Sequence, residues 1–328
     1  MKEKMKKVSH RVVLAGLIAV VMMFGLSTGS VRAHEADPHP HAEDSKVGDT
    51  KYKHPQHGSL GSIGNKLANP LSELWQLSMS YNLPTFYDGD VNKGDGPVGA
   101  ALAFQPVLPI PLFGEGKDQW RMITRPIIPI VFSQPIPRGQ NDFYNKGGIG
   151  DIELPLLLNL PESIAGKFIV GGGPVFLFPT ATSRDLGSNQ WAMGPALVLG
   201  YHGKKTTFGI FPNYFWKIAK AGQNSDQANI SKLSLLYFWN HMLPNAWQVG
   251  ANPTITFNNE ASSGNKWNVP VGFYVGKTTK IGKLPVNIKI GLEYSVVSED
   301  DFGKRAMFRF QITPVIPGLI QKPIFGGG

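Results

Sequence analysis

Seven separated stretches of this chain alternate apolar and polar residues, a period that gives an extended strand two different faces. The clearest stretch runs from Trp75 to Asn82, where the odd positions are apolar and the even positions are small or polar. About a dozen such segments follow one another along the chain, and none contains a long unbroken hydrophobic run. This pattern is typical of an antiparallel transmembrane β-barrel with lipid outside and water or polar side chains inside.

The first 33 residues have the three parts of a secretory signal peptide. A basic start (Lys2, Lys4, Lys6, Lys7 and Arg11) precedes the apolar core Val12–Leu26 and the small-residue cleavage site Val31-Arg32-Ala33. A membrane anchor is the alternative, although the apolar core is short for a span. We therefore expect a secreted chain that begins at His34.

Charge and cysteine content exclude several classes of function. Six of the 32 basic residues and one of the 23 acidic residues lie within positions 1–33, so the remaining chain carries a net charge of +4. That balance gives no reason to expect a nucleic-acid partner. The chain has no cysteine, which excludes disulfides, zinc–thiolate sites and thiol catalysis. After residue 33, no apolar run approaches the roughly 18 residues of a membrane helix.

Twelve strands are predicted, and the charged residues within them set the orientation of the two faces. The strands are placed at residues 73–83, 98–111, 120–132, 150–158, 167–178, 190–201, 206–216, 229–239, 247–257, 267–275, 286–296 and 305–312. A Lys or Arg that faces lipid at mid-depth costs about 2 to 4 kcal/mol, so charges should face the lumen. The pore-lining candidates are Asp151, Glu153, Lys289, Glu293, Arg305 and Arg309, with Arg121 or Arg125 depending on the register of the third strand.

Aromatic residues distinguish the barrel from a soluble β-sandwich, which would alternate in the same way but bury its apolar face. Predicted strands begin at or near Trp75, Trp120, Trp191, Trp247 and Trp267, and others end near Tyr201, Trp216 and Trp239. Such positions indicate two belts at the membrane interfaces. If both termini are periplasmic, the outer connections include 84–97, 133–149 and 179–189 and are mostly longer than the inner ones, as is usual in these barrels.

The segment from residue 34 to residue 72 is expected to precede the barrel, which would occupy residues 73–328. Residues 34–58 are polar and contain five histidines, and residues 59–72 are predicted to form a short interfacial helix. Neutral imidazoles are good ligands for zinc, copper or nickel. The metal candidates are His34, His39, His41, His54 and His57, and the alternative is a flexible tail without fixed geometry.

Several short segments resemble one known family. They are Lys66–Pro70, Phe104–Pro109, Gly148–Ile152, Gly173–Thr182, Trp191–Pro195 and Trp267–Val271, in that order. Together they resemble the bacterial outer-membrane family called transporter, MetA-pathway of phenol degradation, whose members often carry the label neuromedin U. The resemblance implies an outer-membrane barrel with a transport role, hydrophobic or aromatic solutes and no catalytic residues. The histidine-bearing tail and residues 317–328 depart from the family pattern.

Three other groups of residues match known functional motifs only in part. Asp88–Gly96 is similar to a calcium loop, but its turn glycine falls one place late and Gly99 stands where the final glutamate belongs. Gly171-Gly172-Gly173 lies inside a predicted strand, where close strand approach or a bend in the sheet is a better interpretation than phosphate binding. A serine hydrolase in the barrel wall would need a histidine near the outer rim, whereas His202 and His241 fall on predicted periplasmic turns.

The sequence therefore predicts a β-barrel of the Gram-negative outer membrane that lets small molecules cross by passive diffusion. The alternative is a non-conducting barrel that acts as a scaffold or surface-binding protein. We expect no enzyme activity and no cofactor. The expected partners are outer-membrane lipid, a small-molecule solute and the outer-membrane insertion machinery.

Overall fold

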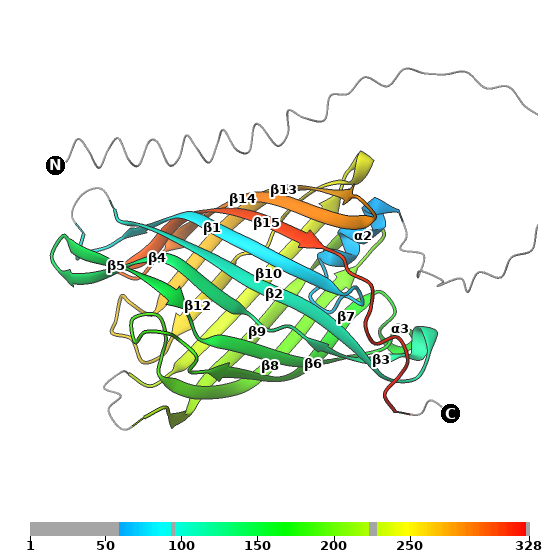
Figure 1. The fold of residues 1–328 in the computed structure, drawn as a ribbon, viewed down its shortest axis with the longest axis horizontal. Helices are drawn as coiled ribbons and strands as arrows, with labels where there is room; N and C mark the ends of the chain where they lie inside the picture. The colour runs from blue at the N-terminus through cyan, green and yellow to red at the C-terminus, as the bar shows by residue number, and fades with distance from the viewer. Residues whose placement is uncertain (1–58, 93–95, 223–227, 326–328) are drawn as a thin grey trace, which may run out of the picture. The chain divides into compact units, whose positions relative to one another are not determined.

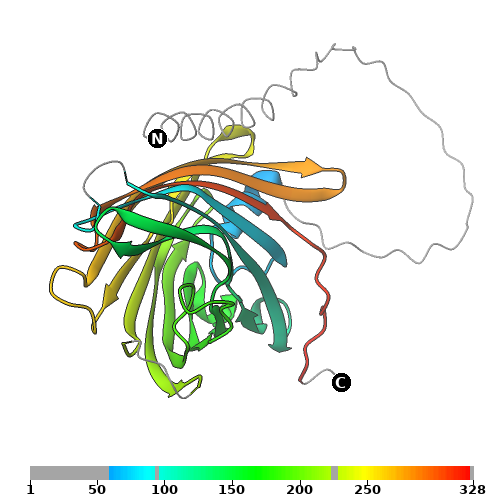
Figure 2. The same cartoon turned by 60° about the vertical axis from the view of Figure 1, so that its left-hand side comes forward.

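The first and last strands of the chain pair with each other, and this pairing closes the sheet into an antiparallel barrel (Figures 1 and 2). The structure is a computed structural model that describes residues 59–92, 96–222 and 228–325. Strand β1 (Gln76–Asp88) pairs with β2 (Val98–Phe113) on one side and with β15 (Gly303–Pro314) on the other. Every pairing is antiparallel, as predicted. No helix in the described ranges is long and apolar enough to cross a membrane.

The bounds of the other elements are as follows. The helices are α2 (Leu60–Leu67) and α3 (Glu162–Ala165), with short 3-10 turns η1 (Gly116–Asp118) and η2 (Pro244–Ala246). The remaining strands are β3 (Trp120–Thr124), β4 (Ile128–Gly139), β5 (Asp142–Ile149), β6 (Ile152–Asn159), β7 (Phe168–Phe178), β8 (Gln190–His202), β9 (Thr206–Lys220), β10 (Ser231–Met242), β11 (Trp247–Ala251), β12 (Thr254–Asn258), β13 (Trp267–Ile281) and β14 (Leu284–Val297).

These strands fill 12 positions in the barrel wall, which confirms the predicted number. Three positions are each made of two strand segments in series, namely β3 with β4, β5 with β6, and β11 with β12. Two of the interruptions contain a proline, Pro126 and Pro253. A proline has no N–H to donate to the ladder, so it locally ends the pairing.

The prediction of a loop at 133–149 is wrong, because β4 and β5 form a hairpin there. Pro135 and Pro137 lie within β4 and are paired with Asn145 and Phe143 of β5. Prolines of this kind signal a loop when the sequence is read alone. At this end of the molecule, however, β4 and β5 extend beyond the interruptions at Pro126 and Gly150, and β5 pairs only with β4.

The apolar rows lie on the outer face of the barrel, as predicted. Phe208, Phe273 and Leu292 are each more than half exposed. Aromatic rings also pair at both ends of the wall. At the α2 end the pairs are Phe113–Trp120, Phe168–Tyr201 and Tyr201–Phe208; at the opposite end they are Phe178–Trp191, Tyr214–Trp216 and Phe257–Trp267. The two predicted belts therefore coincide with the two rims of the barrel.

Trp75 is an exception to the predicted outward orientation, since its side chain is buried. The chain that follows β15 crosses it: the Ile316 N–H donates to the Trp75 carbonyl oxygen over 2.9 Å. Val315 is buried with Ile63 and Leu74 in a small cluster beside it. Residues 315–318, which overrun the last predicted strand, thus cover the start of β1, and Ile324 and Phe325 farther on pair with the end of β2.

The interior is not uniformly polar, which corrects the expectation for the lumen. Twelve buried apolar residues form one cluster: Leu71, Val107, Ile123, Leu157, Ile169, Val175, Ala192, Ala196, Val198, Phe211, Phe215 and Phe238. All but the first belong to strands β2, β3 and β6 to β10. Polar inward residues on β1 and on β13 to β15 include Ser78, Tyr274, Lys289, Glu293, Arg309 and Gln311, and further buried polar residues lie on β8 to β11. The interior therefore combines an apolar cluster with buried polar and charged groups.

Candidate functional site

The helix α2 lies inside the mouth at one end of the barrel (Figures 1 and 2). Its start is fixed by Ser59, whose hydroxyl oxygen accepts a hydrogen bond from the Ser62 N–H over 3.2 Å, and its continuation is blocked by Pro70. The predicted short helix is thus present, but it packs against the inner wall instead of lying at the membrane interface. Residues 59–75 are called the plug below.

Asn65 joins the plug to three parts of the wall. Its amide N–H donates to the Gly203 carbonyl oxygen over 2.8 Å, and its side-chain oxygen accepts a hydrogen bond from the Thr207 hydroxyl over 3.0 Å. The amide of Asn240 approaches the same oxygen at 3.5 Å. Asn65, Thr207 and Asn240 are all buried. Removing any one of them would cost at least one buried hydrogen bond.

A ring of buried polar side chains supports α2 from the other strands. Gln248 donates to Asn287 over 3.1 Å, and Asn287 donates to Thr278 over 2.9 Å. Gly64 faces this ring, since a Cβ atom at that position would lie 2.4 Å from the Thr278 hydroxyl oxygen. Only glycine permits the helix to approach the wall so closely.

Leu71 of the plug packs against the apolar part of the inner wall. Its side chain is fully buried in the main apolar cluster. It contacts β7 at Gly171, where an added Cβ atom would lie 2.5 Å from a Leu71 methyl group. Gly171 therefore accommodates the plug, whereas at Gly173 an added Cβ atom would meet the Leu156 carbonyl oxygen of the neighbouring strand, which confirms the predicted close approach of strands there.

Glu73 forms two ion pairs, one with Lys66 inside the plug and one with Arg121 of β3, and the second holds the plug to the rim. Its carboxylate oxygens lie 2.6 Å from Lys66 Nζ and 3.6 Å from the Arg121 guanidinium. Partial burial alone would raise the pKa of the Glu73 carboxyl, but the hydrogen bond and charge of Lys66, together with Arg121, lower that pKa below its ordinary value.

A cavity of about 50 Å³ lies between the plug and the centre of the barrel. Its floor is Leu67–Pro70 of the plug, and its apolar wall includes Val107, Leu236 and Phe238. The polar wall is made by Gln76, Ser78, Arg125, Asn252, Tyr274, Lys289 and Gln311. A water molecule needs about 10 to 15 Å³ on this scale, so the cavity has room for a few waters.

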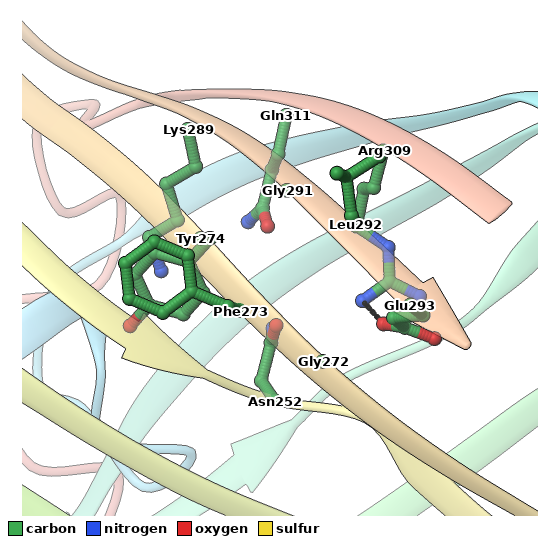
Figure 3. Close-up of a pocket in the computed structure, with 10 residues that line it drawn as sticks. All are labelled: Asn252, Gly272, Phe273, Tyr274, Lys289, Gly291, Leu292, Glu293, Arg309 and Gln311. Atoms are coloured by element: carbon green, nitrogen blue, oxygen red, sulfur yellow. Dashed lines mark ion pairs between the residues drawn. The ribbon is translucent and has the colours of Figure 1, made fainter. Parts of the chain in front are cut away.

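Three charged residues follow one another along the polar wall above this cavity (Figure 3). Lys289 is only 7% exposed, and its ammonium group lies 4.5 Å from the centroid of the Tyr274 ring. Farther along, Arg309 forms an ion pair with Glu293 at 2.8 Å, drawn as a dashed line in Figure 3. Arg309 also donates from Nε to Asn82 over 3.1 Å. These three predicted candidates lie together on the inner face.

Arg305 lies elsewhere, against the prediction. The pairing of β1 with β15 shifts between Phe86–Ala306 and Tyr87–Lys304, which leaves Arg305 as the extra residue of a bulge. Its guanidinium carbon lies 5.0 Å from the ring centroid of Tyr294, an exposed residue on the outer row of β14. A strict period of two cannot foresee this change of face.

The two acidic candidates have different surroundings. Asp151 accepts hydrogen bonds from the N–H of Ala181, the N–H of Ser188 and the Ser188 hydroxyl, so it fastens the β7–β8 connection to the wall. Glu153 follows it on β6, between the outward residues Ile152 and Leu154 that pair with Phe178 and Phe176 of β7. Arg121 and Arg125 both point inward, because each lies two residues from the buried Ile123 and therefore on the same face of the strand.

The remaining candidates fall at the rims or outside the described residues. Nδ1 of His202 lies 2.8 Å from Thr207 Oγ1, and Nδ1 of His241 lies 2.8 Å from Thr206 Oγ1, both at the α2 end. The histidines at 34–57 lie outside the described residues, as do positions 93–95 of the segment similar to a calcium loop. Within the described ranges, no group of three or more His, Asp or Glu is placed to hold a metal.

Sequence reasoning missed Asn65, Leu71 and the polar ring. A signal was present, because Thr207, Asn240, Gln248, Thr278 and Asn287 all fall on the inward rows near one rim. Such a concentration of uncharged polar residues in a confined mouth indicates a bound polypeptide segment as readily as water.

Comparison with known proteins shows likeness of fold alone. No family model and no curated protein matches the chain. Among solved structures, the COG4313 outer membrane channel from Pseudomonas putida F1 matches with a TM-score of 0.55 at 12% identity, over 74% of this chain and 96% of that one. The NanC porin (TM-score 0.43, 12% identity, 74% and 98% covered) and the Pseudomonas putida toluene transporter TodX (TM-score 0.35, 11% identity, 77% and 92% covered) are more distant.

Proposed function

We propose that this protein is a channel of the Gram-negative outer membrane through which small molecules diffuse passively. The observation that carries the proposal is the lumen: a closed barrel contains a cavity lined by Arg125 and Lys289, with Arg309 and Glu293 farther along the same wall. A barrel that served only as a shell could fill this space with apolar side chains and avoid the cost of desolvating charges.

The outer surface supports the membrane location. Exposed apolar rows between two aromatic rims match the lipid-facing band of such barrels. The short connections lie at the α2 end, and we place that end in the periplasm. A signal peptide at 1–33 and insertion by the outer-membrane machinery belong to the same proposal.

Passage through the channel depends on the plug. Residues 59–75 occupy the periplasmic mouth, so passage requires that they shift or leave. The fold of the Pseudomonas putida channel and the sequence resemblance to the MetA-pathway family support a transport role, and the resemblance favours hydrophobic or aromatic solutes.

The same plug is the observation that favours the alternative, a non-conducting barrel. Liposome swelling separates the two functions. The full chain is reconstituted, and swelling is measured with sugars, amino acids and phenols; a second preparation lacks residues 34–58 but keeps the plug. We expect swelling that depends on the solute. A barrel that shows the heat-modifiable migration of a folded protein but admits no solute would contradict the channel and leave the scaffold.

A further inference from the structure

Arg125 and Lys289 are two cations that line the same cavity inside the barrel, where both belong to its polar wall. Lys289 is more than nine-tenths buried. Among the described residues, neither cation takes part in an ion pair. The charged groups that act on Lys289 are Arg125 and Arg309, both cationic. The cavity thus concentrates positive charge without an acidic counterpart.

The neighbours of the two cations compensate them only weakly. The Arg125 guanidinium donates to the Gln105 side-chain oxygen at 3.3 Å, which is a neutral acceptor. Lys289 faces the ring of Tyr274, where a cation–π contact supplies part of the lost hydration. Arg309 farther along is already neutralised by Glu293. A buried cation without a counter-ion is costly, so the cavity favours the entry of an anion.

The apolar lining of the cavity defines the rest of the ligand. Val107, Leu236 and Phe238 add apolar surface to the same cavity, and Val107 lies on β2, the strand next to Arg125. An inorganic anion would leave this surface facing water, whereas an organic acid would cover it. From this juxtaposition we infer that the cavity is a binding site for small organic carboxylates, with the carboxylate held by Arg125 and Lys289 and the apolar body on Val107, Leu236 and Phe238.

This inference rests on the proposed channel function and names a solute class for it. The size of the cavity fits the carboxylate and a few waters, and the floor formed by Leu67–Pro70 belongs to the plug. A larger apolar body is therefore accommodated as the plug shifts. The site lies directly above the plug, where a solute arriving from the outer side would stop before release.

The test is equilibrium binding of benzoate to the full chain in detergent, measured by calorimetry, beside single-channel block by benzoate in planar bilayers. Acetate carries the same charge without the ring, and benzyl alcohol carries the ring without the charge. We expect benzoate to bind more tightly than either. Equal affinity for benzoate and acetate would overturn the role of the apolar wall, and equal affinity for benzoate and benzyl alcohol would overturn the role of the cations.

Variants locate the site. Lys289→Gln and Arg125→Gln should each weaken benzoate binding by about tenfold or more, as expected for the loss of a charge-assisted contact. Lys289→Arg, which keeps the charge, should retain binding. Retained binding in this variant shows that a substitution at position 289 leaves the barrel folded. The matched control is Lys277→Gln: this lysine lies on the outer face, 5.0 Å from the Trp247 ring, and its loss removes one charge without touching the lumen.

The outcomes separate the two proposals. A barrel that binds benzoate through Lys289 and Arg125 but never conducts would overturn the channel and keep the site. A conducting barrel whose affinity for benzoate is the same in wild type, Lys289→Gln and Arg125→Gln would overturn the site and keep the channel. Equal loss of binding in Lys277→Gln would show that net charge, and not this cavity, attracts the anion.

Discussion

The hydroxyl of Thr207 on β9 donates a hydrogen bond to the side-chain oxygen of Asn65 in α2 across 3.0 Å, with both residues buried. This bond joins a segment that precedes the barrel to the inner wall formed 142 residues later. It makes the state of the plug dependent on one asparagine, whose shape and polarity no apolar residue reproduces.

We therefore predict that Asn65→Leu loosens the plug. The substitution removes the hydrogen bonds of Asn65 to Gly203 and Thr207, and each buried hydrogen bond contributes about 0.5 to 1.5 kcal/mol. Liposome swelling should accelerate, and protease should cut between residues 59 and 75 more readily. Ser59→Ala, which removes an exposed helix cap, is the control and should change swelling much less. Unchanged swelling in Asn65→Leu would show that Asn65 does not hold the mouth closed.

Acid should weaken the second attachment of the plug. The pKa of Glu73 lies below its ordinary value of 4.5, because Lys66 and Arg121 outweigh the effect of burial. A carboxyl whose pKa is lowered in the folded state contributes stability above its ordinary pKa and loses it as the pH falls through the lowered one. Swelling should therefore rise as the pH drops below about 4.5. Glu73→Gln should abolish this pH dependence; the same acid response in that variant would assign it to another group.

Breaking the ion pair on the polar wall should cost stability and change selectivity together. Glu293→Gln leaves the Arg309 charge in the lumen without its partner at 2.8 Å. Removal of one member of a buried pair costs about 3 to 5 kcal/mol. We expect a lower midpoint of urea unfolding in lipid vesicles and a reversal potential shifted toward anion preference. A shift toward cation preference would contradict the placement of Arg309 in the conducting path.

The lipid-facing orientation of the outer surface can be tested with arginine substitutions at two depths in the membrane. Leu292 is 63% exposed near the middle of β14, and Val297 is the last residue of that strand. Arg at the bilayer midplane costs about 2 to 4 kcal/mol, and this cost falls to about 0 to 1 kcal/mol near the interface. Leu292→Arg should therefore lower the unfolding midpoint more than Val297→Arg does. Equal effects of the two substitutions would contradict the proposed position of the membrane.

Much of the fold follows from local pattern. A period of two places Leu292 outside and Glu293 inside from the sequence alone, because neighbouring side chains of a strand point to opposite faces. The same rule fails at Arg305, where one extra residue in β15 shifts the register against β1. It also fails for Trp75, because its covering by residues 315–318 depends on contacts far apart in the sequence.

The site was only partly predictable for a similar reason. The inward orientation of Lys289 and Arg309 can be predicted from the alternation of their strands, since a charged residue between apolar ones must face away from lipid. Their relation to Arg125 and to the apolar wall depends on which strands face each other across the lumen, and alternation along one strand carries no such information. The position of Leu71 depends on the packing of the plug against Gly171, which the triplet of glycines permits but does not specify.

A reversible covalent lock tests whether the plug controls passage. The chain has no cysteine, so a pair introduced as Gly64→Cys with Thr278→Cys can only bond within itself. An added Cβ atom at position 64 meets the Thr278 hydroxyl oxygen, so Gly64→Cys moves α2 slightly away from β13, toward the Cβ separation of about 3.5 to 4.5 Å that a disulfide needs, and the reduced double variant is the reference state. Swelling should fall when the pair is oxidised and recover on reduction, because the disulfide ties α2 to β13. Each single variant measured in both redox states is the control, and non-reducing mass spectrometry confirms the bond. If the oxidised double variant admits solutes as fast as the reduced one, the path does not run past the plug.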